Sequence, residues 1–187
     1  MLRLLHGAAL VGPRGRVLEL ARRLAREEAE ARGKVFVDLA KVSGEELDKV
    51  LAGVAENPGR YYLFHVIVAH LADPMDFSIP VPFRGLAMDN VAPEAGRRWE
   101  LQPPKRMLAL AVEGVEGTLV VDVAEASSPH FSAIYPTIHT LVTEKRLGWL
   151  HLSRGVKVVV AAEREDITSR TLNPLKNRLL LFLVDAA

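Results

Sequence analysis

Six short apolar runs, separated by segments with helical periodicity, constrain the fold of this chain more than any other feature. The runs span residues 8–11, 34–39, 61–69, 117–123, 156–162 and 179–184. Runs with few polar positions are expected where both faces of a parallel sheet are covered. Strands that alternate with helices favour a parallel sheet, in which a helix connects each strand to the next. The sequence therefore predicts an α/β fold, a three-layer sandwich with a mostly parallel sheet and helices on both faces.

The predicted helices have recognisable ends. A helical period begins at Arg16, and Gly33 ends that helix. Ser43 and Glu46 form a capping box that opens a second helix, which extends to about position 55. A third helix has Ser128-Pro129 at its start and one apolar face, made by Phe131, Ile134, Ile138 and Leu141. Residues 105–114 predict a shorter helix, and residues 148–155 predict a small hairpin.

Composition excludes several classes of protein. The chain has 187 residues, a formal net charge of +1 and no cysteine, so disulfides and thiolate metal sites are absent. A near-neutral charge argues against nucleic-acid or membrane partners, and no apolar run is long enough to span a bilayer. We expect one cytoplasmic domain over residues 1–187. Abundant Arg and Glu, with a single glutamine, suggest a thermophilic source.

Residues 73–104 form a long Pro- and Gly-rich segment with no predicted strand or helix. Loops of this length in compact domains are usually functional. It carries many apolar side chains, which either pack on their own domain or form a surface for a protein partner: Phe77, Ile79, Val81, Phe83, Leu86, Met88 and Trp99. Both interpretations remain open at the level of sequence.

Ligands of parallel α/β sheets bind beyond the carboxyl ends of the strands. The candidate positions are therefore Gly12–Glu19, Asp38, His70–Asp76, Asp122–Glu125 and Glu163–Asp166. The histidines show no metal-binding spacing, and we expect no metal site from them. The arginines after Arg16 alternate with glutamates, which favours a solvated helix with i,i+4 pairs over a nucleic-acid face.

Several segments, in the right order, resemble the MoxR branch of the AAA+ ATPases. "LVGPRGRVLELARRLA" is similar to the family's phosphate-binding loop. "GTLVVDVAEASSPHFSAIYPTIHTLVTEKRLGWLHLSRGVKVVVAAERED" resembles its stretch from Walker B to sensor 1. "YLFHVIVAHLADPMDFSIPVP" and "LNPLKNRLLLFLV" resemble two further elements of that branch. The resemblance implies an AAA+ core of the P-loop NTPase type.

In the resemblance, the first half of the phosphate-binding loop is kept and the second half is lost. A working loop needs backbone N–H groups around the phosphates, a lysine and a hydroxyl. Without a gap, Leu18 stands at the lysine position and Glu19 at the hydroxyl position. The residues implied for nucleotide or anion binding are Gly12, Pro13, Arg14, Gly15 and Arg16. The plain alternative is a strand–turn–helix joint in which Gly and Pro only shape the turn.

The remaining catalytic positions of the resemblance are also incomplete. Asp122 matches the magnesium-binding carboxylate of Walker B, but Val123 replaces the glutamate that follows it. Glu163 stands near the sensor 1 asparagine. Arg178 matches an arginine that acts on the nucleotide of a neighbouring subunit. The helical lid that normally follows is not expected within these 187 residues.

From these departures we expect a degenerate domain that does not hydrolyse ATP. Its role is that of a non-catalytic subunit or protein-interaction module, in a homo-oligomer or beside an active AAA+ subunit, with no cofactor. One alternative is a weakly active ATPase for chaperone-like remodelling, which binds ATP and Mg²⁺ through Asp122 and compensates with Arg14 or Arg16. Another is a free-standing α/β domain that binds a different anion.

Overall fold

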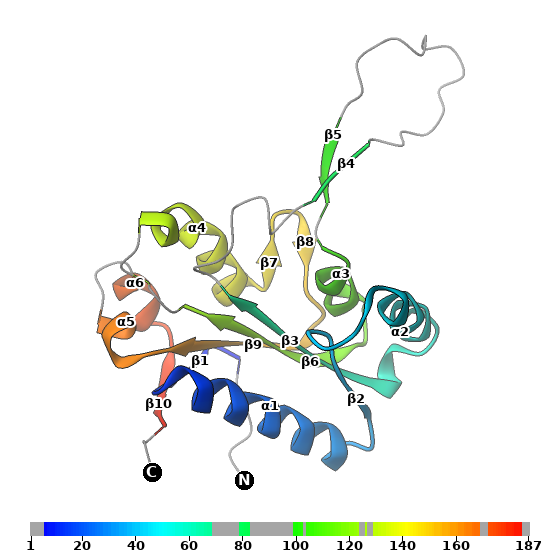
Figure 1. The fold of residues 1–187 in the computed structure, drawn as a ribbon, viewed down its shortest axis with the longest axis horizontal. Helices are drawn as coiled ribbons and strands as arrows, with labels where there is room; N and C mark the ends of the chain where they lie inside the picture. The colour runs from blue at the N-terminus through cyan, green and yellow to red at the C-terminus, as the bar shows by residue number, and fades with distance from the viewer. Residues whose placement is uncertain are drawn as a thin grey trace.

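A six-stranded parallel sheet forms the centre of the molecule (Figure 1). The computed structural model describes residues 6–68, 79–82, 99–102, 104–123, 126, 129–168 and 172–184. Every neighbouring pair of strands in this sheet is parallel. In spatial order the strands are β10 (Leu180–Leu183), β1 (Ala8–Val11), β9 (Gly155–Ala162), β6 (Glu116–Asp122), β3 (Tyr61–Val68) and β2 (Val35–Asp38).

Helices cover both faces of the sheet, which confirms the predicted three-layer α/β architecture. Helix α1 lies on one face, and α2, α3 and α4 lie on the other (Figure 1). Their bounds are Arg14–Ala31, Gly44–Glu56, Lys105–Ala111 and Pro129–Glu144. Under α1, Val17 and Ala21 pack with Phe64 and Val120. On the opposite face, Leu119 packs in a larger apolar cluster that also holds residues of α2 to α4.

The helix ends follow from local chemistry. Helix α1 begins two residues before the predicted start, because the Pro13 carbonyl already accepts a hydrogen bond from the Val17 N–H at 3.0 Å. Gly33 follows the helix with a φ of +63°, as its predicted role requires. The capping box of Ser43 and Glu46 is present at the start of α2. The predicted apolar face of α4 is buried at all four positions.

Some small elements differ from the sequence-based expectation. Strands β4 (Ile79–Pro82) and β5 (Trp99–Gln102) form an antiparallel pair, so the prediction of a fully irregular 73–104 segment was wrong there. The rest of that segment up to residue 103, and the side chains of both strands, lie outside the described part of the chain. Pro80 and Pro82 alternate along β4, where the described residues leave one edge of the strand unpaired, and proline is tolerated at such an edge.

Several short elements connect the larger ones. The predicted hairpin is confirmed as β7 (Arg146–Leu147) and β8 (Leu150–His151), although its first strand precedes Gly148. A 3-10 turn, η1 (Pro58–Arg60), leads into β3. Helices α5 (Arg164–Thr168) and α6 (Asn173–Lys176) link β9 to β10. Among the described helices, none combines the length and apolar character needed to cross a bilayer.

Candidate functional site

The carboxyl ends of β1, β6 and β9 converge on one small polar site. The chain leaves β1 through α1 on one face, whereas α5 and α6, which follow β9, contribute to the core on the opposite face. Adjacent strands whose connections diverge in this way create a crevice where ligands of α/β proteins bind. Arg14, Asp122 and Glu163 follow or end these three strands. The sequence had placed all three among its candidate positions.

Arg14 and Asp122 form an ion pair at the centre of this site. The Arg14 Nε donates to Asp122 Oδ2 at 2.6 Å. The Asp122 side chain is only 1% exposed, whereas that of Arg14 is 38% exposed. Along β6 alternate residues face the same side, so Asp122 and Val120 both face α1. A charge-assisted hydrogen bond to a buried carboxylate is stronger than an ordinary surface pair.

Glu163 occupies the amino end of α1. Its Oε1 accepts a hydrogen bond from the Arg14 backbone N–H at 3.3 Å. A helix N-terminus presents free N–H groups and positive potential, and it therefore favours a negative group. A carboxylate of this chain already lies where an exogenous anion would bind. Arg14 thus contacts two carboxylates, one through its side chain and one through its backbone.

The turn between β1 and α1 has only two residues, Gly12 and Pro13. A P-loop arches over six residues from its first to its second glycine before the helix begins. Here Gly15 and Arg16 already lie in the first turn of α1 and are exposed. Gly12 has a packing reason of its own, because a Cβ there would lie 2.3 Å from the Val184 carbonyl oxygen.

Asp166 connects the segments that follow β6 and β9. Its Oδ1 accepts from the Ala126 N–H at 2.9 Å, and its Oδ2 accepts from the Glu163 N–H at 3.4 Å. The Asp166 side chain is buried. Asp166 therefore holds the backbone of Glu163 in place beside α1.

Other predicted site residues lie elsewhere. Asp38 pairs with Arg22 at 2.8 Å and is separated from β6 by β3. Arg178 precedes β10 and lies at the opposite end of the β1–β10 pair from Gly12; it is exposed and forms no ion pair with a described residue. Arg16 likewise has no ion pair in the described ranges. Residues 69–78 and Glu125 are outside those ranges.

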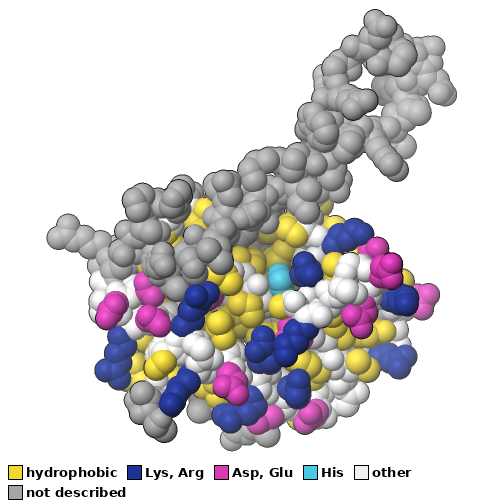
Figure 2. Space-filling view, viewed as in Figure 1, with side chains coloured by type: hydrophobic (Ala, Val, Ile, Leu, Met, Phe, Trp, Pro, Cys, Tyr) yellow, Lys and Arg dark blue, Asp and Glu magenta, His cyan; other side chains and the backbone are white. Residues whose placement is uncertain are grey.

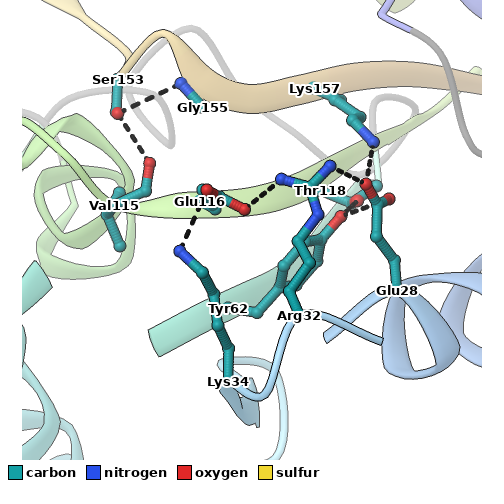
Figure 3. A network of polar contacts seen from close by, with 10 residues as sticks. All are labelled: Glu28, Arg32, Lys34, Tyr62, Val115, Glu116, Thr118, Ser153, Gly155 and Lys157. Carbon is teal, nitrogen blue, oxygen red and sulfur yellow. Dashed lines mark hydrogen bonds and ion pairs between the residues drawn. The ribbon is translucent and has the colours of Figure 1, made fainter. Parts of the chain in front are cut away.

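A second polar cluster lies nearer the amino ends of the strands, and the sequence did not predict it (Figure 3). Glu28 of α1 accepts hydrogen bonds from the Tyr62 hydroxyl at 3.0 Å, from Arg32 at 2.5 Å and from Lys157. The Tyr62 oxygen also lies 2.9 Å from the Thr118 hydroxyl. The predicted i,i+4 pairing holds for Glu28 and Arg32, but Glu28 is buried rather than solvated.

The signal for this cluster was present in the helical pattern. Glu28 follows Val17, Ala21 and Ala25 along the buried stripe of α1. A carboxylate at such a position needs partners, because burying an unpaired charge is costly.

Burial raises the pKa of Tyr62. At Glu116, burial opposes ionisation, but the hydrogen bonds from Lys34 and Arg32 outweigh it and lower the pKa of that carboxyl.

The described surface mixes both signs of charge. Figure 2 shows Lys and Arg interspersed with Asp and Glu around a patch of hydrophobic side chains on this face. Within the described ranges, no three His, Asp or Glu side chains are close enough together to hold a metal ion.

Comparison of the chain with protein-family models, with curated proteins and with solved structures finds no match.

Proposed function

We propose that this chain is a degenerate MoxR-like AAA+ domain that does not hydrolyse ATP and acts as a non-catalytic subunit or protein-interaction module. The observation that carries the proposal is the ion pair between Arg14 and Asp122. Asp122 is the carboxylate that the family resemblance assigns to Mg²⁺. In this chain an internal cation, the Arg14 guanidinium, neutralises it.

The surrounding geometry supports the same proposal. A two-residue turn leaves no loop to wrap a phosphate, and Glu163 accepts the N–H of Arg14 at the start of α1. A nucleotide phosphate there would meet the carboxylates of Glu163 and Asp122 at close range. Two like charges about 4 Å apart repel by about 4 kcal/mol at an effective dielectric of 20. Nucleotide binding would therefore require both carboxylates and Arg14 to rearrange.

Thermal unfolding with and without millimolar ATP and Mg²⁺ tests the proposal. We expect no change in the unfolding midpoint beyond that given by the same concentration of sulfate with Mg²⁺. A ligand at 100 times its dissociation constant would stabilise the fold by about 2.7 kcal/mol, which is readily detected. A midpoint that rises with ATP and Mg²⁺ but not with sulfate, and does so less in Asp122→Ala, would establish the weak ATPase alternative instead.

The partner side of the proposal has its own test. If the chain works beside an active AAA+ subunit, the exposed Arg178 is the residue through which it would reach the neighbour's nucleotide. Arg178→Ala should lower the partner's ATPase rate without changing assembly. Arg16→Ala is the matched control, because Arg16 is also exposed but lies at the other end of the sheet. Equal rates for both variants would remove this role from Arg178.

A further inference from the structure

Strand β10 forms an edge of the central sheet whose outer side is unpaired in the described part of the chain. The Leu180 N–H donates to the Gly7 carbonyl at 3.0 Å, and the Val184 N–H donates to the Val11 carbonyl at 2.8 Å. Even-numbered residues of β10 therefore direct their backbone groups toward β1. The N–H and C=O groups of Leu181 and Leu183 consequently point away from the sheet.

The side chains of this edge are apolar on both faces of the sheet. Leu180 is 55% exposed on the face of α1, and Leu181 and Leu183 are 39% and 66% exposed on the other. The sequence from 179 to 184 contains no charged residue and no proline. Natural edge strands usually carry such residues, because they prevent pairing with another chain.

The opposite edge of the same sheet is protected. On β2, the Asp38 carboxylate binds Arg22 and accepts the Ala40 N–H at 3.1 Å. The Arg26 guanidinium lies 5.3 Å from the centre of the Phe36 ring. Charged groups therefore lie beside two of the four residues of β2, and the contrast with the uncharged 179–184 segment identifies β10 as the edge that is open to pairing.

We propose that β10 pairs antiparallel with β10 of a second copy of this chain and joins the two sheets into one. In an antiparallel pair, two residues directly opposite each other either both direct their N–H and C=O groups toward the other strand or both direct them away from it. A two-fold axis at Phe182 then places Leu181 opposite the partner's Leu183. It also places Leu180 opposite the partner's Val184. Each exposed leucine of β10 would meet an apolar side chain on both faces of the joined sheet.

Two-fold symmetry supports a second copy as the occupant, and the size of the edge sets the affinity. A second copy closes the contact by symmetry, because both sides of a two-fold interface are the same patch. Three partly exposed leucines on a four-residue strand cover far less than the ~800 Å² per partner of a standard interface. The dimer is therefore weak and concentration-dependent. It does not depend on whether the Arg14 site binds nucleotide.

Sedimentation velocity of the full chain from about 1 µM to about 1 mM tests the proposal. Wild-type protein should shift from monomer to dimer within this range. Leu183→Lys should weaken dimerisation at least tenfold, since it adds a charge to the edge without removing a buried contact. Val35→Lys is the matched control, because Val35 is 43% exposed on the β2 edge. A wild-type monomer at about 1 mM, or a dimer that Val35→Lys disrupts equally, overturns the proposal.

Single-cysteine variants test the register, since the chain has no cysteine of its own. Residues directly opposite in a non-hydrogen-bonded antiparallel pair have Cα atoms about 4.5 Å apart, within the range of a disulfide. Phe182→Cys should therefore oxidise to a covalent dimer. Leu180→Cys, whose symmetry mate lies several residues away, should not. Cross-linking of Leu180→Cys alone would contradict this register, and circular dichroism checks that each variant folds.

Discussion

At the scale of single residues, Arg14 forms the ion pair at the carboxyl ends of the central strands. Its guanidinium lies 2.6 Å from a carboxylate that is almost completely buried. Arg14→Ala should lower the free energy of unfolding by about 1–3 kcal/mol, because Asp122 loses a charged donor that water replaces incompletely. Urea unfolding at pH 7 measures the change.

Arg16→Ala serves as the control for that variant. Arg16 is exposed in the same first turn of α1 and has no ion pair with a described residue, so the change should stay within about 0.5 kcal/mol. Equal losses for the two variants would mean that the ion pair contributes nothing beyond the general cost of shortening an arginine.

Substitutions at Gly12 and Gly15 distinguish a glycine that packing requires from one that packing does not require. A Cβ at Gly12 would lie 2.3 Å from the Val184 carbonyl oxygen, whereas a Cβ at Gly15 has open space around it. Gly12→Ala should therefore destabilise the fold by about 1–3 kcal/mol. Gly15→Ala should stabilise it by about 0.5–1 kcal/mol, because alanine favours the helix. Thermal unfolding of the two variants checks the opposite signs; two losses of similar size would refute the packing explanation for Gly12.

At the scale of elements, the sequence predicted what local chemistry determines. Strand β1 has the predicted bounds, and the capping box at Ser43 starts α2. Helices α5 and α6, with five and four residues, are too short to show a helical period. The β4–β5 pair was missed because its prolines are typical of a loop, and its pairing depends on residues about twenty positions apart.

The cluster around Glu28 ties α1 to three strands of the sheet. Its members come from α1, β3, β6 and β9, so it fixes the helix at the end remote from Arg14. Tyr62→Phe removes the hydroxyl that contacts both Glu28 and Thr118, and should cost about 1–3 kcal/mol of stability. In this variant, amide hydrogen exchange should become faster in the last two turns of α1.

Tyr61→Phe is the matched control for this element. Tyr61 precedes Tyr62 on β3 and faces the opposite side of the sheet, where it is partly exposed. We expect a change within about 0.5 kcal/mol and unaltered exchange in α1. If both variants behave alike, the cluster does not anchor the helix.

At the scale of the whole molecule, strand order determines which predicted residues meet. The sequence identified Arg14, Asp122 and Glu163 separately, because each follows or ends an apolar strand. It could not predict their contact, which depends on β1 lying beside β9 and on β9 lying beside β6. The same strand order places β3 between Asp38 and β6, and it places β10 at an edge of the sheet. These outcomes depend on long-range pairing rather than on local pattern.

The pH dependence of global stability follows from a histidine within this sheet. Burial lowers the pKa of His65 to about 4 from its ordinary 6.5; Arg106 lowers it further and Asp38 opposes the shift. Its Nδ1 is buried without a hydrogen-bond partner in the described ranges. Between pH 6.5 and 4, the unfolded chain binds a proton that the folded chain excludes. The free energy of unfolding should therefore decrease as the pH is lowered from 6.5 to 4, by up to about 3 kcal/mol.

His65→Leu isolates this contribution to the pH profile. The variant cannot bind the proton in either state, so it should lose less stability than the wild type between pH 7 and pH 5. Urea unfolding at the two pH values measures the difference. His151→Gln, at an exposed histidine of β8, should keep the wild-type dependence. If His65→Leu also keeps it, the acid sensitivity of the fold arises from other groups, and the His65 imidazole does not govern it.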